Sequence, residues 1–241
     1  MDLVLLGIAF VSSFTGALIQ AVCGFGNGPI NMAVLPHIFP YQYAVALTSL
    51  CGFVMSVTIV VTNWKHVNFR MMLPCALTSI VFSSLSVHLS VGAARSVMMH
   101  SLGVMLILLG IYNIFFNGKI SFAPTIRNGI IAGIISGICS GMFGMSGPTS
   151  AIFVLAASES KEEYRATLNA VFVITVIGAL TARIREGTIT AAVVHTWLLL
   201  LIAVAAGLLV GSCIFNRLNQ RTMRICVYGF LIISGISMLL N

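Results

Sequence analysis

Charged residues are scarce in this chain of 241 residues. Only 7% of the sequence is Asp, Glu, Lys or Arg, whereas 59% is apolar. A soluble globular domain carries about 25% charged residues, so these few charges cannot cover the surface of a soluble protein. The shortage excludes a separate soluble domain and predicts an integral membrane protein that spans the bilayer several times.

Acidic residues are absent from every long apolar segment. The chain has five, and all of them fall at segment ends or in loops: Asp2, Glu159, Glu162, Glu163 and Glu186. A membrane site without carboxylates suits an anion better than a cation, because nothing in it would neutralise a positive charge. It also lacks the acidic side chains that commonly relay protons. The absence predicts a small anionic substrate.

Metal-binding and nucleic-acid-binding patterns are also missing. The six cysteines form no CxxC pair and have no metal-ligand spacing, so the sequence predicts neither a metal site nor a cofactor. The 12 Lys and Arg residues are scattered through short connections and form no stripe that would bind nucleic acid. The expected partners are therefore the lipid bilayer and the anion, and the sequence leaves open whether two copies form a homodimer.

What the chain does contain is a series of long apolar segments. A helix needs about 20 apolar residues to span a bilayer. Two shorter segments of roughly ten residues, about 29–38 and 148–157, follow glycine-rich breaks and are too short to span it alone. The predicted fold is all-α, with the two short half-helices and eight long transmembrane helices at about 3–22, 42–62, 71–90, 96–116, 127–141, 166–182, 190–212 and 225–240.

The order of long and short segments occurs twice. The break Cys23-Gly24-Phe25-Gly26-Asn27-Gly28-Pro29 matches Met142-Phe143-Gly144-Met145-Ser146-Gly147-Pro148, and Ala46-Leu47-Thr48-Ser49 matches Ala166-Thr167-Leu168-Asn169. These matches predict two membrane repeats, 1–116 and 127–241, which residues 117–126 connect.

The positions of the basic residues distinguish parallel from inverted repeats. If each short segment dips into the membrane and returns, the basic residues divide evenly between the two faces. If each short segment changes sides, only Arg95, Arg183 and Arg185 lie on one face. Nine against three is the asymmetry that the positive-inside rule produces, so we predict inverted-topology repeats with both termini outside. The nine residues on the inner face are then Lys65, Arg70, Lys119, Arg127, Lys161, Arg165, Arg217, Arg221 and Arg224.

Glycine-rich breaks at corresponding places of inverted halves indicate the substrate site of a transporter. Pro29 and Pro148 suit the first position of a helix, so we expect the short helices to begin there, with Gly28 and Gly147 as N-caps. The first N–H groups of such helices have no intrahelical acceptor and lie at the positive end of the helix dipole. They attract a compact oxyanion, and here they belong to Ile30, Asn31, Thr149 and Ser150.

Polar side chains stand beside these predicted helix starts and on the helices that follow. An alternative interpretation is that the glycines only allow close helix packing and that the hydroxyl groups bond their own helices. Because the break occurs twice, we favour a binding site. The predicted substrate-binding residues are Gly26, Asn27, Gly28, Ile30, Asn31, Thr48, Ser49, Gly144, Ser146, Gly147, Thr149, Ser150, Thr167 and Asn169.

Three stretches of the sequence resemble a known family. They are the Gly24-Phe25-Gly26-Asn27-Gly28 break with Pro36 downstream, the segment Ala46-Leu47-Thr48-Ser49-Leu50 and the stretch from Gly211 to Leu240. Together they resemble the TauE/SafE sulfite exporter family, also described as the toluene-sulfonate uptake permease group, over nearly the whole chain. The resemblance implies a multi-pass carrier of the cell inner membrane for sulfite, sulfonates or related sulfur oxyanions.

Two other functions are weighed against a carrier. An anion channel would use the same site without an alternating gate. An intramembrane serine protease would use Ser146 of Gly144-Met145-Ser146-Gly147 as nucleophile and His195 as base; however, Asn27, at the matching position of the first break, cannot be a nucleophile. We therefore predict a secondary transporter of sulfur oxyanions or organosulfonates, such as sulfite or sulfoacetate, and not an enzyme.

Overall fold

The structure, a computed structural model, describes residues 3–115, 125–146, 148–214 and 232–240. Within these ranges the chain forms helices and short connections without a strand, which confirms the all-α prediction. Six helices are long and apolar enough to cross a membrane, so this is a multi-pass membrane protein. They are α1 (Leu3–Cys23), α3 (Tyr41–Thr62), α4 (Phe69–Val91), α6 (Ile126–Phe143), α8 (Lys161–Arg185) and α9 (Ala191–Ile214).

The prediction of eight long helices is not met within the described residues. The segment expected at 96–116 forms the 21-residue helix α5 (Arg95–Phe115), which is not among these six spans. Of the segment expected at 225–240, the structure describes only residues 232–240, which are helical.

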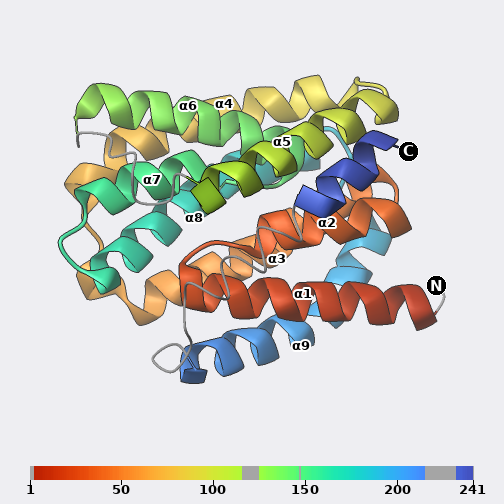
Figure 1. The fold of residues 1–241 in the computed structure, drawn as a ribbon, viewed down its shortest axis with the longest axis horizontal. Coiled ribbons are helices and arrows are strands. Elements are labelled where there is room, and N and C mark those ends of the chain that lie inside the picture. Colours follow the sequence, from red (N-terminus) through yellow and green to blue (C-terminus); the bar gives the residue numbers. More distant parts are fainter. Residues whose placement is uncertain (1–2, 116–124, 147, 215–231, 241) are drawn as a thin grey trace.

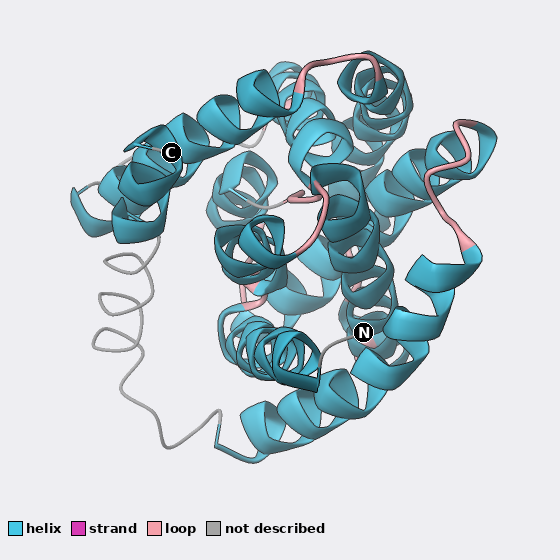
Figure 2. Cartoon of the chain, turned by 90° about the vertical axis from the view of Figure 1, so that its right-hand side faces the viewer, coloured by secondary structure: helices cyan, strands magenta, loops and turns pink. Residues whose placement is uncertain are grey.

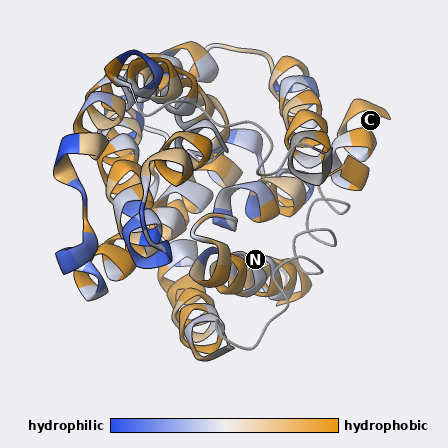
Figure 3. Cartoon of the chain, turned by 60° about the vertical axis from the view of Figure 1, so that its left-hand side comes forward, coloured by the Kyte–Doolittle hydropathy of each residue, from blue (hydrophilic) through white to orange (hydrophobic). Residues whose placement is uncertain are grey.

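The outer faces of the long helices are apolar. Leu77 and Leu85 of α4 are more than half exposed, as are Ile202 and Leu209 of α9. Such continuous apolar surfaces face lipid or another apolar partner and not water. Figure 3 shows hydrophobic residues along the lengths of the helices, whereas hydrophilic residues gather at connections between them.

The short helices form where the breaks predict them. As expected, α7 (Pro148–Ala157) begins at Pro148. In contrast, α2 (Asn27–Ile38) begins two residues before Pro29, because Gly26 is its N-cap with φ 148°, a conformation open to glycine alone. The N–H of Ile30 bonds the Gly26 carbonyl over 3.1 Å. The prediction of an unpaired N–H at Ile30 is therefore wrong, and Asn31, the fifth residue of α2, lies beyond the four unsatisfied positions of a helix.

Each short helix folds back along the helix before it, in opposite directions in the two halves (Figure 1). The end of α1 lies near the first turn of α8, where the Tyr164 ring faces Gly24, and α2 returns to the other end of the bundle. There Gln42, just after α2, accepts from Arg183, which also donates to the Gly141 carbonyl near the end of α6. The helix α7 then leads back, so that Ser158, just after it, shares a pocket with Gly24. We refer to the two ends as the Arg165 end and the Arg183 end.

Long helices of one half pack against long helices of the other through glycines. Figure 2 shows the helices of the bundle packed side by side in an end-on view. On α6, glycines at four-residue spacing lie against α4, and a Cβ on Gly137 would come 2.6 Å from the Ser79 carbonyl oxygen. On α9, a Cβ on Gly211 would come 2.7 Å from the Ala21 Cβ on α1. Small residues at helix interfaces allow such close backbone contact in membranes.

Candidate functional site

The two glycine-rich breaks touch each other inside the bundle. A Cβ added to Gly28 would lie 3.0 Å from the Met145 Cα and 3.2 Å from the Gly144 carbonyl oxygen. Gly144 itself has φ 66° and ends α6 in the left-handed conformation, as glycine commonly does after a helix. The two segments that match in sequence are therefore neighbours in space.

A small cavity lies beside this contact. Its volume is about 30 Å³, which equals the share of liquid volume of roughly one water molecule. The residues that line it include no carboxylate and no histidine. They are Gln20, Phe25, Gly26, Asn27, Gly28, Pro29, Thr48, Ser49, Gly52, Ser56, Gly144, Ser146, Phe172 and Val176.

Asn27 is held in one orientation by a chain of hydrogen bonds. Its Nδ2 donates to the Thr48 carbonyl over 3.2 Å, and a carbonyl can only accept. Its Oδ1 therefore faces away and accepts from Asn31 Nδ2 over 2.8 Å, while Asn31 Oδ1 accepts from the Ser12 hydroxyl over 2.7 Å. The second N–H of the Asn27 side-chain amide remains available to donate to a ligand. The absence of a side chain at Gly52 leaves space beside this nitrogen. Asn31 thus positions Asn27 from outside the cavity lining.

Gln20 is a cavity residue that sequence reasoning missed. Its Nε2 donates to the Ser56 hydroxyl over 3.2 Å and to Asn169 Oδ1 over 3.1 Å. Asn169 Nδ2 in turn donates to the carbonyls of Gly24 and Arg165, which fixes the orientation of both amides. Ser56 accepts from Gln20 and keeps its own proton to donate. The sequence signal was an amide inside an apolar helix, three residues before the break.

Three of the predicted hydroxyl residues line the cavity, but their protons point elsewhere. Ser49 Oγ donates to the carbonyl one turn earlier in its own helix, and Thr48 Oγ1 donates to the Met32 sulfur over 3.5 Å. Ser146 Oγ donates to Ser140 Oγ over 2.9 Å. In this conformation they offer lone pairs to the cavity, so its side-chain donors are Asn27 and Ser56.

Other predicted residues lie away from the cavity. Ser150 faces α4, 3.4 Å from a cysteine sulfur. Thr167 Oγ1 accepts from the Asn68 backbone N–H at the Arg165 end. The Thr149 hydroxyl oxygen is buried without a hydrogen-bond partner and does not belong to the cavity lining. Gly147 lies outside the described residues.

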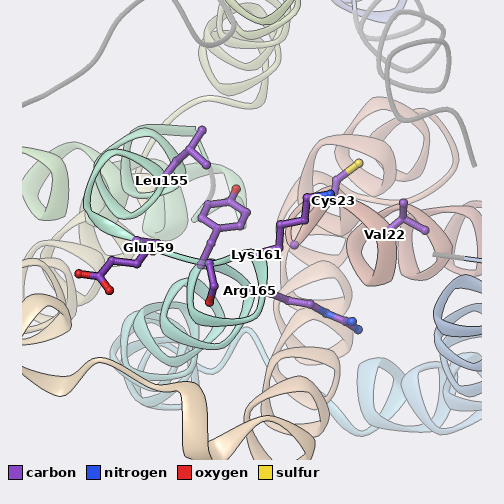
Figure 4. Close-up of a pocket in the computed structure, with 10 residues that line it drawn as sticks. Val22, Cys23, Leu155, Glu159, Lys161 and Arg165 are labelled. Carbon is purple, nitrogen blue, oxygen red and sulfur yellow. The ribbon is translucent and has the colours of Figure 1, made fainter. Parts of the chain in front are cut away.

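A larger pocket of about 310 Å³ opens at the Arg165 end. It is lined by the end of α1, the connection between α7 and α8, and the first turns of α8. Figure 4 shows the Arg165 side chain extending toward the side on which α1 lies, whereas Glu159 points away. With Lys161 also in its lining, the pocket presents positive charge beside the first break.

The cavity offers no support for nucleophilic catalysis. Because Ser146 donates to another serine and no histidine lines the cavity, nothing in the lining could act as its base. Across the part of the chain that the structure describes, no group of His, Cys, Asp and Glu could hold a metal ion.

Comparison with known proteins assigns most of the chain to one family. The model of the family described as "Sulfite exporter TauE/SafE" matches residues 8–238. No curated protein and no solved structure shows significant similarity to the chain.

Proposed function

The chain belongs to the TauE/SafE sulfite exporter family, whose members are membrane transporters, and from this premise we propose that it carries small sulfur oxyanions or organosulfonates by alternating access. The anion, such as sulfite or sulfoacetate, binds in the cavity between the two breaks.

The observation that carries this proposal is the contact of the two breaks beside a polar cavity without carboxylates. The first turn of α2 contributes the N–H groups of Asn27 and Gly28, which have no intrahelical acceptor and lie at the positive end of the helix dipole. The Asn27 amide and the Ser56 hydroxyl add side-chain donors. Backbone and side-chain donors around one point suit an oxyanion, and no lining side chain carries a negative charge that would repel it.

The size of the cavity indicates a closed site. A volume of about 30 Å³ is too small for an organosulfonate, so the breaks must separate when the anion enters. Because α1–α2 and α6–α7 point in opposite directions, rocking of one half against the other opens the site to each end in turn. We propose inverted-topology repeats over 1–116 and 127–241, with both termini outside, as the basis of this motion.

The test is an anion panel on purified protein. A ligand that binds the folded state raises its melting temperature by mass action, so we expect sulfite, thiosulfate or sulfoacetate to raise it more than sulfate, taurine or monocarboxylates do. Asn27→Leu and Ser146→Leu should abolish flux in proteoliposomes while the protein still inserts and purifies normally. Wild-type flux in the double variant would show that the anion does not bind in this cavity.

The two alternative functions, an anion channel and an intramembrane protease, can be tested with the same purified protein. Conductance far above carrier turnover identifies an anion channel. Labelling of Ser146 by a serine-reactive phosphonate, together with loss of cleavage of a membrane substrate in Ser146→Ala, identifies a protease.

A further inference from the structure

Two arginines on α8 lie on the same side of the helix, at opposite ends of the cavity. Arg165 and Arg183 are 18 residues apart, which is five helical turns and about 27 Å. Between them Phe172 and Val176, on the same side of α8, line the cavity. Along one side of α8, the cavity-lining residues therefore lie between two positively charged side chains.

The two arginines have opposite environments. Arg165 is partly exposed and borders the 310 Å³ pocket. Arg183 has no exposed surface. The Arg165 end therefore holds an open pocket, whereas at the other end the Arg183 side chain is enclosed by protein.

Arg183 fills that end by joining three helices. Its Nη2 donates to the Gly141 carbonyl in the last turn of α6 over 2.6 Å, and its Nη1 donates to Gln42 Oε1 in the first turn of α3 over 3.2 Å. Beside it, the Tyr41 hydroxyl donates to the Met142 carbonyl over 2.8 Å. We refer to the Arg183 bonds with Gly141 and Gln42 as the Arg183 latch.

The charge of Arg183 has no carboxylate partner among the described residues. Glu186, one turn further on, is bonded to His88 over 2.7 Å, and the other described acidic residues lie at the Arg165 end. The guanidinium donates to the Gly141 carbonyl and to Gln42 Oε1, at the negative end of the α6 dipole, and its Nε is buried without a hydrogen-bond partner. A buried charge compensated only by dipoles is costly, so an arriving anion is a strong competitor for it.

We propose that the Arg183 latch closes the passage at its end, and that an anion arriving from that side opens it by replacing Gly141 and Gln42 as the partner of the guanidinium. The inference rests on the proposed function and adds to it a specific outer gate. The role of Arg183 is to keep this gate closed through its hydrogen bonds with Gly141 and Gln42. The donors of the cavity bind the anion after the gate has opened.

Val45 provides the position for a reporter. It lies on α3 one turn after Gln42 and one turn before Ser49, and its side chain faces Gly144. In a chain whose six cysteines are replaced by serine or alanine, Val45→Cys places a single thiol between the latch and the cavity. A membrane-impermeant cationic thiosulfonate added from the Arg183 side then measures how often that end opens.

Two substitutions should change the labelling rate in opposite directions. Arg183→Gln removes the latch and should raise the rate about tenfold or more. Gln42→Glu gives the guanidinium a carboxylate partner and should lower it, because charge-assisted bonds are stronger than neutral ones. Arg185→Gln, an exposed neighbour on the same helix end, is the matched control and should leave the rate unchanged. If Arg183→Gln does not fold, Gln42→Ala loosens the latch without removing the buried charge.

If Arg183 had only a structural role, Arg183→Gln and Gln42→Glu would not change the labelling rate in opposite directions. Equal rates in Arg183→Gln and Arg185→Gln, or a change of the same sign in Arg183→Gln and Gln42→Glu, would overturn the latch.

The anion step is tested with sulfoacetate, because sulfite itself attacks thiol reagents. Sulfoacetate added from the Arg183 side should raise the labelling rate in the chain with Arg183 and not in Arg183→Gln. If it raises neither rate but still raises the melting temperature, opening by the anion is wrong and the proposed function stands. If it does not raise the melting temperature while the two variants shift labelling in opposite directions, the latch stands and the proposed substrate is wrong.

Discussion

Gln20 and Asn169, 149 positions apart in the chain, are joined by a hydrogen bond of 3.1 Å. The bond ties α1, just before the first break, to α8 of the other half. Because Asn169 also bonds the Gly24 carbonyl, it holds the start of that break in place. The cavity is thus assembled across the two halves, because residues of both line it.

Asn27→Asp should strongly weaken anion binding with little change in side-chain size. The substitution replaces the Nδ2 donor by a carboxylate oxygen, so an anion in the cavity loses a hydrogen bond and gains a repelling charge. We expect the Kd for sulfoacetate to rise by a factor on the order of 100, measured by equilibrium binding to the purified protein. Asn128→Asp, the same change in the first turn of α6, is the control. Equal Kd values for the two variants would exclude Asn27 as a ligand.

Ser56→Ala tests the second side-chain donor. Loss of one hydrogen bond to a charged ligand costs about 1.4 kcal/mol, or roughly tenfold in Kd. The same binding measurement checks this, with Ser84→Ala, in a groove near the His88–Glu186 pair, as the comparison. An unchanged Kd in Ser56→Ala would leave Asn27 and the start of α2 as the only donors.

Gly137→Ala should destabilise the protein although alanine favours helix formation. The added Cβ would meet the Ser79 carbonyl oxygen at 2.6 Å and the Ser83 nitrogen at 3.0 Å, and these backbone atoms of α4 cannot move separately. Overpacking of this kind costs roughly 1–3 kcal/mol, more than the gain of about 1 kcal/mol in helix propensity. A melting curve in detergent measures the difference. Gly7→Ala, which meets nothing within 4 Å, should melt at or slightly above the wild-type temperature; a lower Tm for it than for Gly137→Ala would contradict the packing argument.

The extent of the helices near the breaks could be predicted because the signals are local. Long apolar runs mark α1 and α3, and glycine followed by proline marks the start of α7. The first residue of α2 was predicted too late, because Gly26 and not Gly28 has the backbone conformation that only glycine adopts. Two side chains near the breaks, Asn27 and Ser146, line one cavity; their role as anion ligands stays a prediction.

The residues one or two turns from the breaks could not be placed in the same way. Ser56 lines the cavity and Thr167 does not, although both are small hydroxyl residues in apolar helices. A helix that is apolar on all sides has no polar stripe to show which side faces inward. Only the neighbouring helices decide that, and they placed Thr167 against the connection before α4 instead.

The order of the amino acids was enough to establish a membrane-embedded helical chain with two interrupted segments, since hydrophobicity and the special backbones of glycine and proline act within a few residues. Which groups face one another depended on folding. The pairing of Gln20 with Asn169 and the burial of Arg183 between three helices join positions distant in the chain. Such contacts follow from how whole helices pack, because close backbone approach at glycines fixes the rotation of each helix and so the direction of every side chain it carries.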